Sequence, residues 1–204
     1  MKSLFILLLV IAIPSIAMAQ EYPEYGVKVE TIATNLTIPW DIDWAPDGRI
    51  FFSERNGNLR VIEDGKLLPP VLSLDVGNGE GGMLGVVLDP SFEQNHYIYI
   101  YYTYDEFLST KNKLVRFVES NNVLTEDKVL LEGIPGASYH DGGRIDFGPD
   151  GKLYVTTGDA GNPDLSQDLS SLAGKILRIN SDGTIPDDNP FENSPVYSYG
   201  HRNP

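Results

Sequence analysis

The hydrophobic positions of this chain alternate with polar ones over short runs, and turn residues separate the runs. Residues 41–44 alternate, and residues 50–54 are rich in aromatic and β-branched side chains. Between them, residues 46–48 read Pro-Asp-Gly, which predicts a turn because proline presets φ, aspartate hydrogen-bonds its own backbone and glycine accepts positive φ. The pattern predicts a strand, a turn and a second strand, and it excludes a stable helix over 49–54.

The strand–turn–strand unit recurs along the chain. Residues 143–155 repeat it around a second Pro-Asp-Gly turn, and residues 84–90 lead through a longer connection to the apolar run 97–102. Four short strands every ~40 to 50 residues are typical of a β-propeller, whose inner strands tend to carry glycine because the blades converge on an axis. An all-β sandwich has similarly spaced strands, and the repeat favours the propeller. Further hairpins are predicted at 59–65, 113–118 and 176–183.

The first nineteen residues have the organisation of a secretory signal peptide. Lys2 supplies a positively charged N-terminal region, and residues 4–12 carry no polar side chain. Residues 17–19 read Ala-Met-Ala, the small-x-small motif that signal peptidase cleaves after. The alternative is a membrane anchor, but the apolar run is shorter than the roughly 20 residues that a spanning helix needs. We expect cleavage after Ala19 and export of residues 20–204 to the periplasm or the exterior, with no membrane span after cleavage.

Composition narrows the function classes. The chain has 204 residues, of which 41% are hydrophobic, and its 15 Lys and Arg against 29 Asp and Glu give a net charge of −14. Such a chain is globular rather than disordered, and its charge argues against nucleic acid or anionic lipid as a partner. The chain contains no cysteine, which excludes disulfides, thiolate metal sites and a cysteine nucleophile.

The length raises a question about closure of the ring. Residues 20–204 correspond to about three to four blades of ~45 residues, and residues 200–204 form a polar run without a closing strand. Because an open ring leaves bare sheet edges, the alternatives are a small four-bladed ring or a propeller domain truncated at its C-terminus. We favour the truncated domain.

Two polar clusters could meet at one end of a predicted hairpin. His140 precedes the strand near residue 145, and Asp159 follows the strand that begins near residue 152. A histidine at the mouth of a propeller channel suits a general base, and a neighbouring carboxylate would orient its ring and stabilise its protonated form. The plainer alternative is a pair of solvated turns.

Weaker candidates lie elsewhere. Arg202 and Asn203 offer donors for a carboxylate or an oxyanion, although they could equally belong to an ordinary loop. Glu80 lies in the glycine-rich run 77–82, which leads into a strand rather than a helix and so is not a phosphate-binding loop. The sequence contains no serine nucleophile elbow and no zinc-protease motif, and no metal-ligating residue is assigned.

Taken in order, these clusters resemble the soluble quinoprotein sugar dehydrogenases, the family of soluble glucose and aldose sugar dehydrogenases. Each stretch alone is weak evidence, but the order and spacing of the whole series are specific. The matching stretches are 38–41, 81–86, 89–92, 140–145, 148–154, 158–159, 172–178 and 200–204.

The resemblance implies a six-bladed β-propeller, incomplete in this chain, that oxidises the anomeric carbon of aldose sugars to lactones. Hydride would pass to pyrroloquinoline quinone (PQQ), and calcium would be bound by residues beyond Pro204. The natural electron acceptor stays unknown. The residues of this chain are expected to be inactive by themselves, since they cover roughly the first half of the family's ring. The alternatives are a calcium-dependent propeller lactonase and a non-enzymatic exported binding propeller.

The resemblance also implies roles for individual residues. His140 matches the base that removes the proton of the anomeric hydroxyl, and Asp159 matches its carboxylate partner. Arg202 matches the arginine near the reactive quinone carbonyl. The cofactor-binding residues would be Asn203, Glu80, which stands where the glucose-specific branch has a glutamine, and Gln167.

Overall fold

The computed structural model describes residues 20–22 and 27–204, which form two units that divide after Thr34. In the first unit, β1 (Gln20–Tyr22) pairs antiparallel with β2 (Val27–Val29). The predicted signal peptide, residues 1–19, lies outside the described residues. No helix in the described ranges is long and apolar enough to cross a bilayer.

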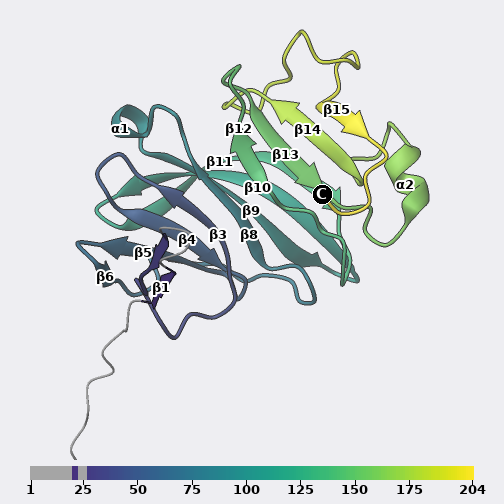
Figure 1. Cartoon of the computed structure of the whole chain (residues 1–204). Helices are drawn as coiled ribbons and strands as arrows, with labels where there is room; N and C mark the ends of the chain where they lie inside the picture. Colours follow the sequence, from purple (N-terminus) through teal and green to yellow (C-terminus); the bar gives the residue numbers. More distant parts are fainter. Residues whose placement is uncertain (1–19, 23–26) are drawn as a thin grey trace, which may run out of the picture. The chain divides into compact units, whose positions relative to one another are not determined.

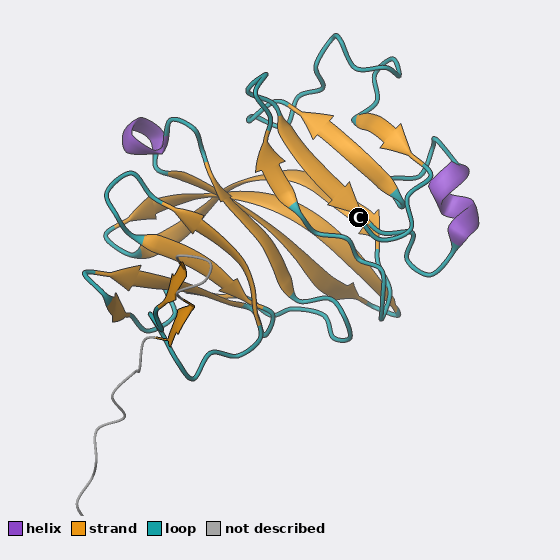
Figure 2. Cartoon of the chain, viewed as in Figure 1, coloured by secondary structure: helices purple, strands orange, loops and turns teal. Residues whose placement is uncertain are grey.

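The second unit consists of three antiparallel sheets and two short helices (Figures 1 and 2). Within each sheet, strands that follow one another in sequence mostly lie side by side. The first sheet contains β3 (Pro39–Trp44), β4 (Ile50–Glu54), β5 (Asn58–Glu63), β6 (Lys66–Leu67) and β7 (Leu72–Ser73), the second β8 (Met83–Leu88), β9 (Tyr97–Glu106), β10 (Ser109–Ser120) and β11 (Val123–Pro135), and the third β12 (Ile145–Phe147), β13 (Leu153–Thr157), β14 (Lys175–Ile179) and β15 (Val196–Tyr199); the helices are α1 (Phe92–Asn95) and α2 (Pro163–Gln167).

The predicted all-β class is confirmed, and so are the hairpins built on Pro-Asp-Gly turns. In the β3–β4 turn, Gly48 has φ +91° and its N–H donates to the Ala45 carbonyl over 3.0 Å. In the β12–β13 turn, Gly151 has φ +70° and donates to the Gly148 carbonyl over 2.9 Å. The turns near residues 90 and 150 are farther apart in sequence than those near residues 47 and 90. The reason is the length of the strands between them, since β9, β10 and β11 have 10, 12 and 13 residues.

The first strands of the three sheets lie next to one another. Two carboxylates of β3 accept hydrogen bonds from backbone N–H groups of β8: Asp41 from Val86 over 3.1 Å and Asp43 from Leu88 over 2.8 Å. Burial raises the pKa of both carboxyl groups. At Gly85, an added Cβ would lie 2.2 Å from the carbonyl oxygen of Gly143, so glycine permits the close approach of β8 to the segment that leads into β12.

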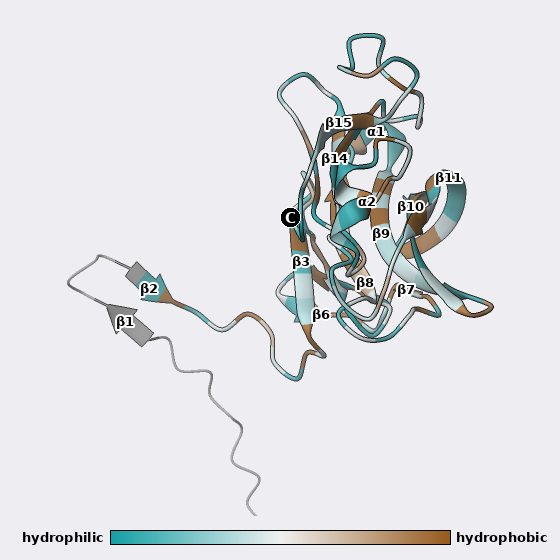
Figure 3. Ribbon diagram, turned by 90° about the vertical axis from the view of Figure 1, so that its right-hand side faces the viewer, coloured by the Kyte–Doolittle hydropathy of each residue, from teal (hydrophilic) through white to brown (hydrophobic). Residues whose placement is uncertain are grey.

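Two hydrophobic clusters fill the spaces beside the second sheet. One is shared with the first sheet and includes Phe51, Met83 and Ile100. The other is shared with the third sheet and includes Tyr99 and Val155. In Figure 3, strands of the sheets carry brown, hydrophobic segments, as do some loops, whereas α2 is hydrophilic. The second sheet therefore holds the other two in place through side chains on both of its faces.

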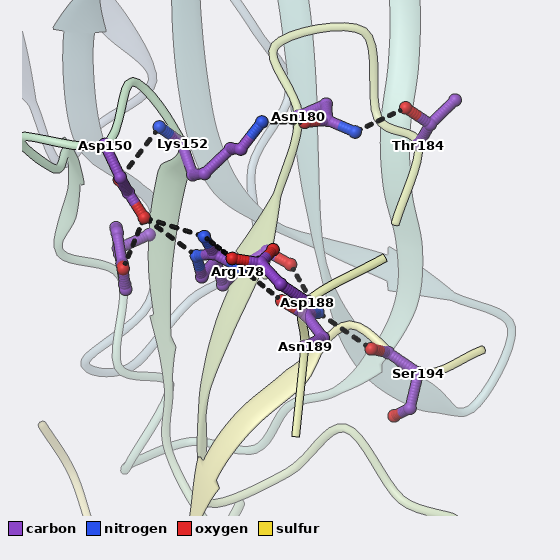
Figure 4. Close-up of polar contacts among 9 residues, drawn as sticks. Asp150, Lys152, Arg178, Asn180, Thr184, Asp188, Asn189 and Ser194 are labelled. Carbon is purple, nitrogen blue, oxygen red and sulfur yellow. Dashed lines mark hydrogen bonds and ion pairs between the residues drawn. The ribbon is translucent and has the colours of Figure 1, made fainter. Parts of the chain in front are cut away.

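Arg178 fixes the long connection between β14 and β15 (Figure 4). Its guanidinium is buried and donates to Asp150 over 2.9 Å, to Asp188 over 2.7 Å and to Asn189 over 2.9 Å. The connection is thereby tied to the β12–β13 turn, which contains Asp150. This cluster lies at the turn end of the third sheet, whereas the loops that precede β12 and follow β13 lie at the other end.

Candidate active site

His140 and Asp159 meet at the end of the β12–β13 hairpin. His140 precedes β12 and Asp159 follows β13, and the antiparallel pairing of these strands, with Ile145 opposite Val155, brings both loops to one end of the sheet. The His140 Nδ1 lies 2.8 Å from Asp159 Oδ1. The two side chains are 11% and 5% exposed, so the hydrogen bond is largely shielded from water.

The two backbone segments that carry His140 and Asp159 approach each other unusually closely. His140 has φ +65°, which is uncommon for a residue with a side chain and is held here by its neighbours. The Ala160 N–H donates to the His140 carbonyl over 3.2 Å, and Gly161 N–H donates to Asp159 Oδ1 over 2.8 Å. A Cβ added at Gly158 would lie 1.8 Å from the carbonyl oxygen of His140. Only glycine at position 158 allows the two loops to approach this closely.

Glu80, in the loop that leads into β8, is hydrogen-bonded to the loop that contains His140. Its carboxylate accepts the His140 N–H over 3.0 Å, and its own N–H donates to the Ser138 carbonyl over 2.9 Å. The guanidinium of Arg55 hydrogen-bonds to the carbonyls of Gly79 and Gly81 on either side of it. The glycine-rich run 77–82 is therefore held by hydrogen bonds with Arg55 on one side and with the loop of His140 on the other.

The segment that contains Arg202 and Asn203 crosses the same loops. Asn203 Oδ1 accepts the Gly142 N–H over 2.9 Å, and the Arg202 carbonyl accepts the Asp159 N–H over 2.8 Å. Within the described part of the chain, the Arg202 guanidinium has no hydrogen bond or ion pair. This exposed cation is therefore free to bind an anionic or carbonyl group of a ligand.

These residues border a cavity of about 390 Å³, which falls within the range of small-molecule sites. His140 Nδ1 is engaged by Asp159, and Nε2 has no partner among the described residues, so this nitrogen is free to accept a proton from a bound molecule. Gln167, the last residue of α2, is exposed and does not border the cavity. The lining residues are Tyr139, His140, Asp159, Gly161, Pro163, Ser166, Gly200, His201 and Arg202.

Several residues at the cavity are not identified by sequence reasoning. The ring of Tyr139 is 46% exposed and stands perpendicular to that of His140, with centroids 4.7 Å apart. His201 Nε2 lies 2.8 Å from Ser198 Oγ. Tyr139 precedes His140 and His201 precedes Arg202 in the sequence. This position next to a predicted site residue is the only sequence signal for a place at the cavity. Which neighbour borders the cavity depends on the loop conformation, which the residue pattern does not specify.

Asp141 is a buried carboxylate beside the site. Its Oδ1 accepts N–H groups from the Asn112 side chain and the Ala137 backbone, each over 3.1 Å. Its Oδ2 is the one buried side-chain N or O atom without a partner among the residues described. Burial, reinforced by the charge of Glu80, raises the pKa of the Asp141 carboxyl against the opposing effect of Asn112. The residue pattern around Asp141 does not indicate its burial.

The ranges covered by the structure hold no group of three or more His, Cys, Asp or Glu side chains arranged to bind a metal ion. The chemistry that they offer is proton transfer at His140, supported by Asp159, together with an unpaired guanidinium at the rim of the cavity. This combination suits a reaction in which a proton leaves a hydroxyl group next to an electron-poor acceptor.

Comparison with known proteins identifies the family. Residues 36–204 match the family model described as Glucose / Sorbosone dehydrogenase. The chain is 34% identical to the aldose sugar dehydrogenase of Escherichia coli and 33% identical to quinoprotein glucose dehydrogenase B of Acinetobacter calcoaceticus, covering 52% and 44% of their lengths with 87% and 86% of its own. The chain thus spans about half the length of the relatives it matches.

A solved structure supports the same assignment. The PQQ-bound aldose sugar dehydrogenase of Streptomyces coelicolor is 39% identical and superposes with a TM-score of 0.78 over 86% of this chain and 54% of that one. The all-β fold of antiparallel sheets described above is thus similar to that of a PQQ-bound sugar dehydrogenase. Sequence and fold agree that this chain belongs to the glucose/sorbosone dehydrogenase family.

Proposed function

We propose that the chain is part of an exported enzyme that oxidises the anomeric carbon of aldose sugars to lactones with PQQ as hydride acceptor. The observation that carries the proposal is the His140–Asp159 pair. Nδ1 is held by a carboxylate 2.8 Å away, while Nε2 is free beside a cavity of ligand size. A base prepared in this way is what removal of a proton from a sugar hydroxyl requires.

His140 carries out the proton transfer, and Asp159 supports it. Nε2 takes the proton of the anomeric hydroxyl as the C1–H bond breaks and its electron pair leaves as hydride, so that C1 and its oxygen form the lactone carbonyl. The Asp159 carboxylate accepts a hydrogen bond from Nδ1–H and stabilises the imidazolium that results. A positioned base of this kind contributes about 10² to 10⁴ in rate.

Residues of this chain also suit the cofactor. PQQ, when bound, supplies a flat, triply anionic quinone that accepts the hydride. In a chain with a net charge of −14, such an anion needs local cations, and the unpaired guanidinium of Arg202 is one at the cavity. The Asn203 amide stands beside it, and Glu80 contributes by holding the His140 backbone. Gln167 is not among the residues that border the cavity and has no part in this proposal.

The wider architecture is part of the same proposal. We place the three sheets as the first half of a six-bladed ring, because the chain spans about half the length of its relatives. The ligands of calcium would lie outside these 204 residues, and the signal sequence in residues 1–19 would direct the protein to the periplasm or the exterior.

Substitution of His140 by Ala tests the proposal in the protein extended to the length of its relatives. We expect reduction of an artificial electron acceptor by aldose to fall by about 10² to 10⁴, with PQQ binding retained. An equal loss of PQQ binding would assign His140 to the cofactor instead. Lactone hydrolysis without a quinone would support the lactonase, and an absence of both activities in the unmutated protein would support a binding propeller.

A further inference from the structure

Lys175, the first residue of β14, is an unusual buried cation near the cavity. Its side chain is fully buried, although lysine is almost never fully buried unless paired. No carboxylate among the described residues forms an ion pair with it. Burial lowers the pKa of its ammonium group, and the charge of Asp168 only partly opposes this.

Three backbone carbonyls surround the ammonium group. Lys175 Nζ lies 2.6 Å from the carbonyl oxygen of Ala173, 2.8 Å from that of Leu165 and 3.1 Å from that of Ser166. A lysine ammonium has three N–H donors, so each donor has one acceptor. We call this arrangement the carbonyl cage, and it compensates the desolvation that burial imposes on the charge.

Two of the cage carbonyls come from the last turn of α2. The final carbonyls of a helix have no donor within the helix and carry partial negative charge. The last turn of α2 contains no basic residue of its own, and Lys175 supplies the missing cation from a strand that follows it in sequence. Each of the two carbonyls also accepts one backbone N–H from outside the helix. The ammonium is therefore a second donor to each carbonyl and supplies the charge that the last turn of α2 lacks.

The cage adjoins the segments that line one side of the cavity. The Ser166 carbonyl also accepts the N–H of Gly200 over 2.9 Å, and the Gly174 carbonyl accepts the N–H of His201 over 3.1 Å. Ser166, Gly200 and His201 all border the cavity. A displacement of α2 would therefore move the wall that contains these three residues.

We propose that Lys175 is a positioning residue whose ammonium acts as the resident cation of the carbonyl cage and holds the α2 wall of the cavity in place. The role of the wall in seating the sugar rests on the function proposed above, whereas the cage itself does not. Since the Lys175→Ala variant leaves the three carbonyls and removes the side chain beyond Cβ, the vacated cage should accept a small primary alkylammonium ion such as propylammonium.

Amide hydrogen exchange on the 204-residue chain tests the cage without any need for turnover. In Lys175→Ala, the N–H groups of Asp168 and Gly200, which donate to the Leu165 and Ser166 carbonyls, should exchange at least about ten-fold faster. Propylammonium should restore slow exchange, whereas tetramethylammonium at equal ionic strength, which has no N–H donor, should not. Lys175→Met should show fast exchange that propylammonium does not slow, because its side chain fills the space.

Lys128→Ala is the matched control. Lys128 is an exposed lysine whose Nζ donates to one backbone carbonyl, that of Asp182, over 2.8 Å, and its removal should leave exchange at α2 unchanged. If Lys175→Ala does not fold by itself, recovery of folded protein with propylammonium, and not with tetramethylammonium, supports the proposal. Wild-type exchange in Lys175→Ala, or equal effects of the two ions, would overturn it.

Kinetics of the protein extended to the length of its relatives connect the cage with the site. Lys175→Ala should raise KM for the sugar by about ten-fold or more with a much smaller change in kcat, because a wall that positions the substrate is displaced while His140 stays in place. Propylammonium should restore KM. If exchange responds as expected but the unmutated enzyme oxidises no sugar, the proposed function fails and the cage stands; if KM is unchanged, the positioning role fails.

Discussion

Gly158 gives the most direct structural prediction, because an added methyl group there would force the site apart. The Cβ of Gly158→Ala would lie 1.8 Å from the His140 carbonyl oxygen and 2.2 Å from its carbonyl carbon, and real Cβ contacts shorter than 3.0 Å are essentially never seen. The two loops must therefore separate by about 1.2 Å, the difference between 3.0 and 1.8 Å. The Ala160–His140 hydrogen bond, already 3.2 Å long, would break.

The magnitude follows from those losses. Overpacking costs about 1 to 3 kcal/mol, and each backbone hydrogen bond contributes about 0.5 to 1.5 kcal/mol. Alanine also restricts the unfolded chain, which offsets about 0.4 to 1 kcal/mol. We therefore expect the free energy of unfolding of the 204-residue chain to fall by about 0.5 to 4 kcal/mol, measured by urea titration of the tryptophan fluorescence.

The control is Gly48→Ala. Gly48 has φ +91° and no atom within 4 Å of an added Cβ, so its cost is the backbone strain of about 1 to 2 kcal/mol, less the same unfolded-chain offset of about 0.4 to 1 kcal/mol. If Gly158→Ala were no more destabilising than Gly48→Ala, and if the His140 ring resonances were unchanged, the close approach of the two loops would be refuted.

Two further substitutions test other parts of the structure. Asp43→Ala should lower the free energy of unfolding by about 1 to 3 kcal/mol more than Asp146→Ala. Each of these carboxylates accepts the N–H of the next residue, but only Asp43 also accepts the N–H of Leu88 in the neighbouring sheet. Equal losses of stability in urea titrations would contradict this. The pKa of the Asp141 carboxyl is raised in the fold, so the folded chain binds this proton more tightly than the unfolded chain does. The folded state therefore loses stability as the pH rises from the unfolded pKa to the folded pKa of this carboxyl. Asp141→Asn should therefore unfold at higher urea concentration than the wild type at pH 7, with the difference shrinking toward the unfolded pKa of about 4; a wild type that is more stable at both pH values would contradict this.

The hairpins could be predicted because their chemistry is local. Pro-Asp-Gly defines the turn by itself, and a turn between two antiparallel strands fixes which flanking loops meet. The proximity of His140 and Asp159 follows from this reasoning. The start of α2 is local in the same way, since Asn162 caps the helix and Pro163 occupies its first turn.

Contacts between sheets could not be predicted in the same way. Glu80 lies in the loop that leads into β8 and accepts the N–H of His140, in the loop that leads into β12, so their contact depends on how the second and third sheets pack. Lys175 is still less accessible to pattern reasoning, because a lysine at the start of a strand is expected to face solvent, and its burial depends on carbonyls supplied by α2 and Ala173. Interactions across elements decide these positions.

The protonation pattern of His140 tests the central claim most directly. Nitrogen-15 NMR of the imidazole in the 204-residue chain, at a pH where the ring is neutral, reports which nitrogen carries the proton. The hydrogen bond to Asp159 predicts a proton on Nδ1 and an unprotonated Nε2 available as a base. A proton found on Nε2, or a ring that does not respond to Asp159→Asn, would contradict it.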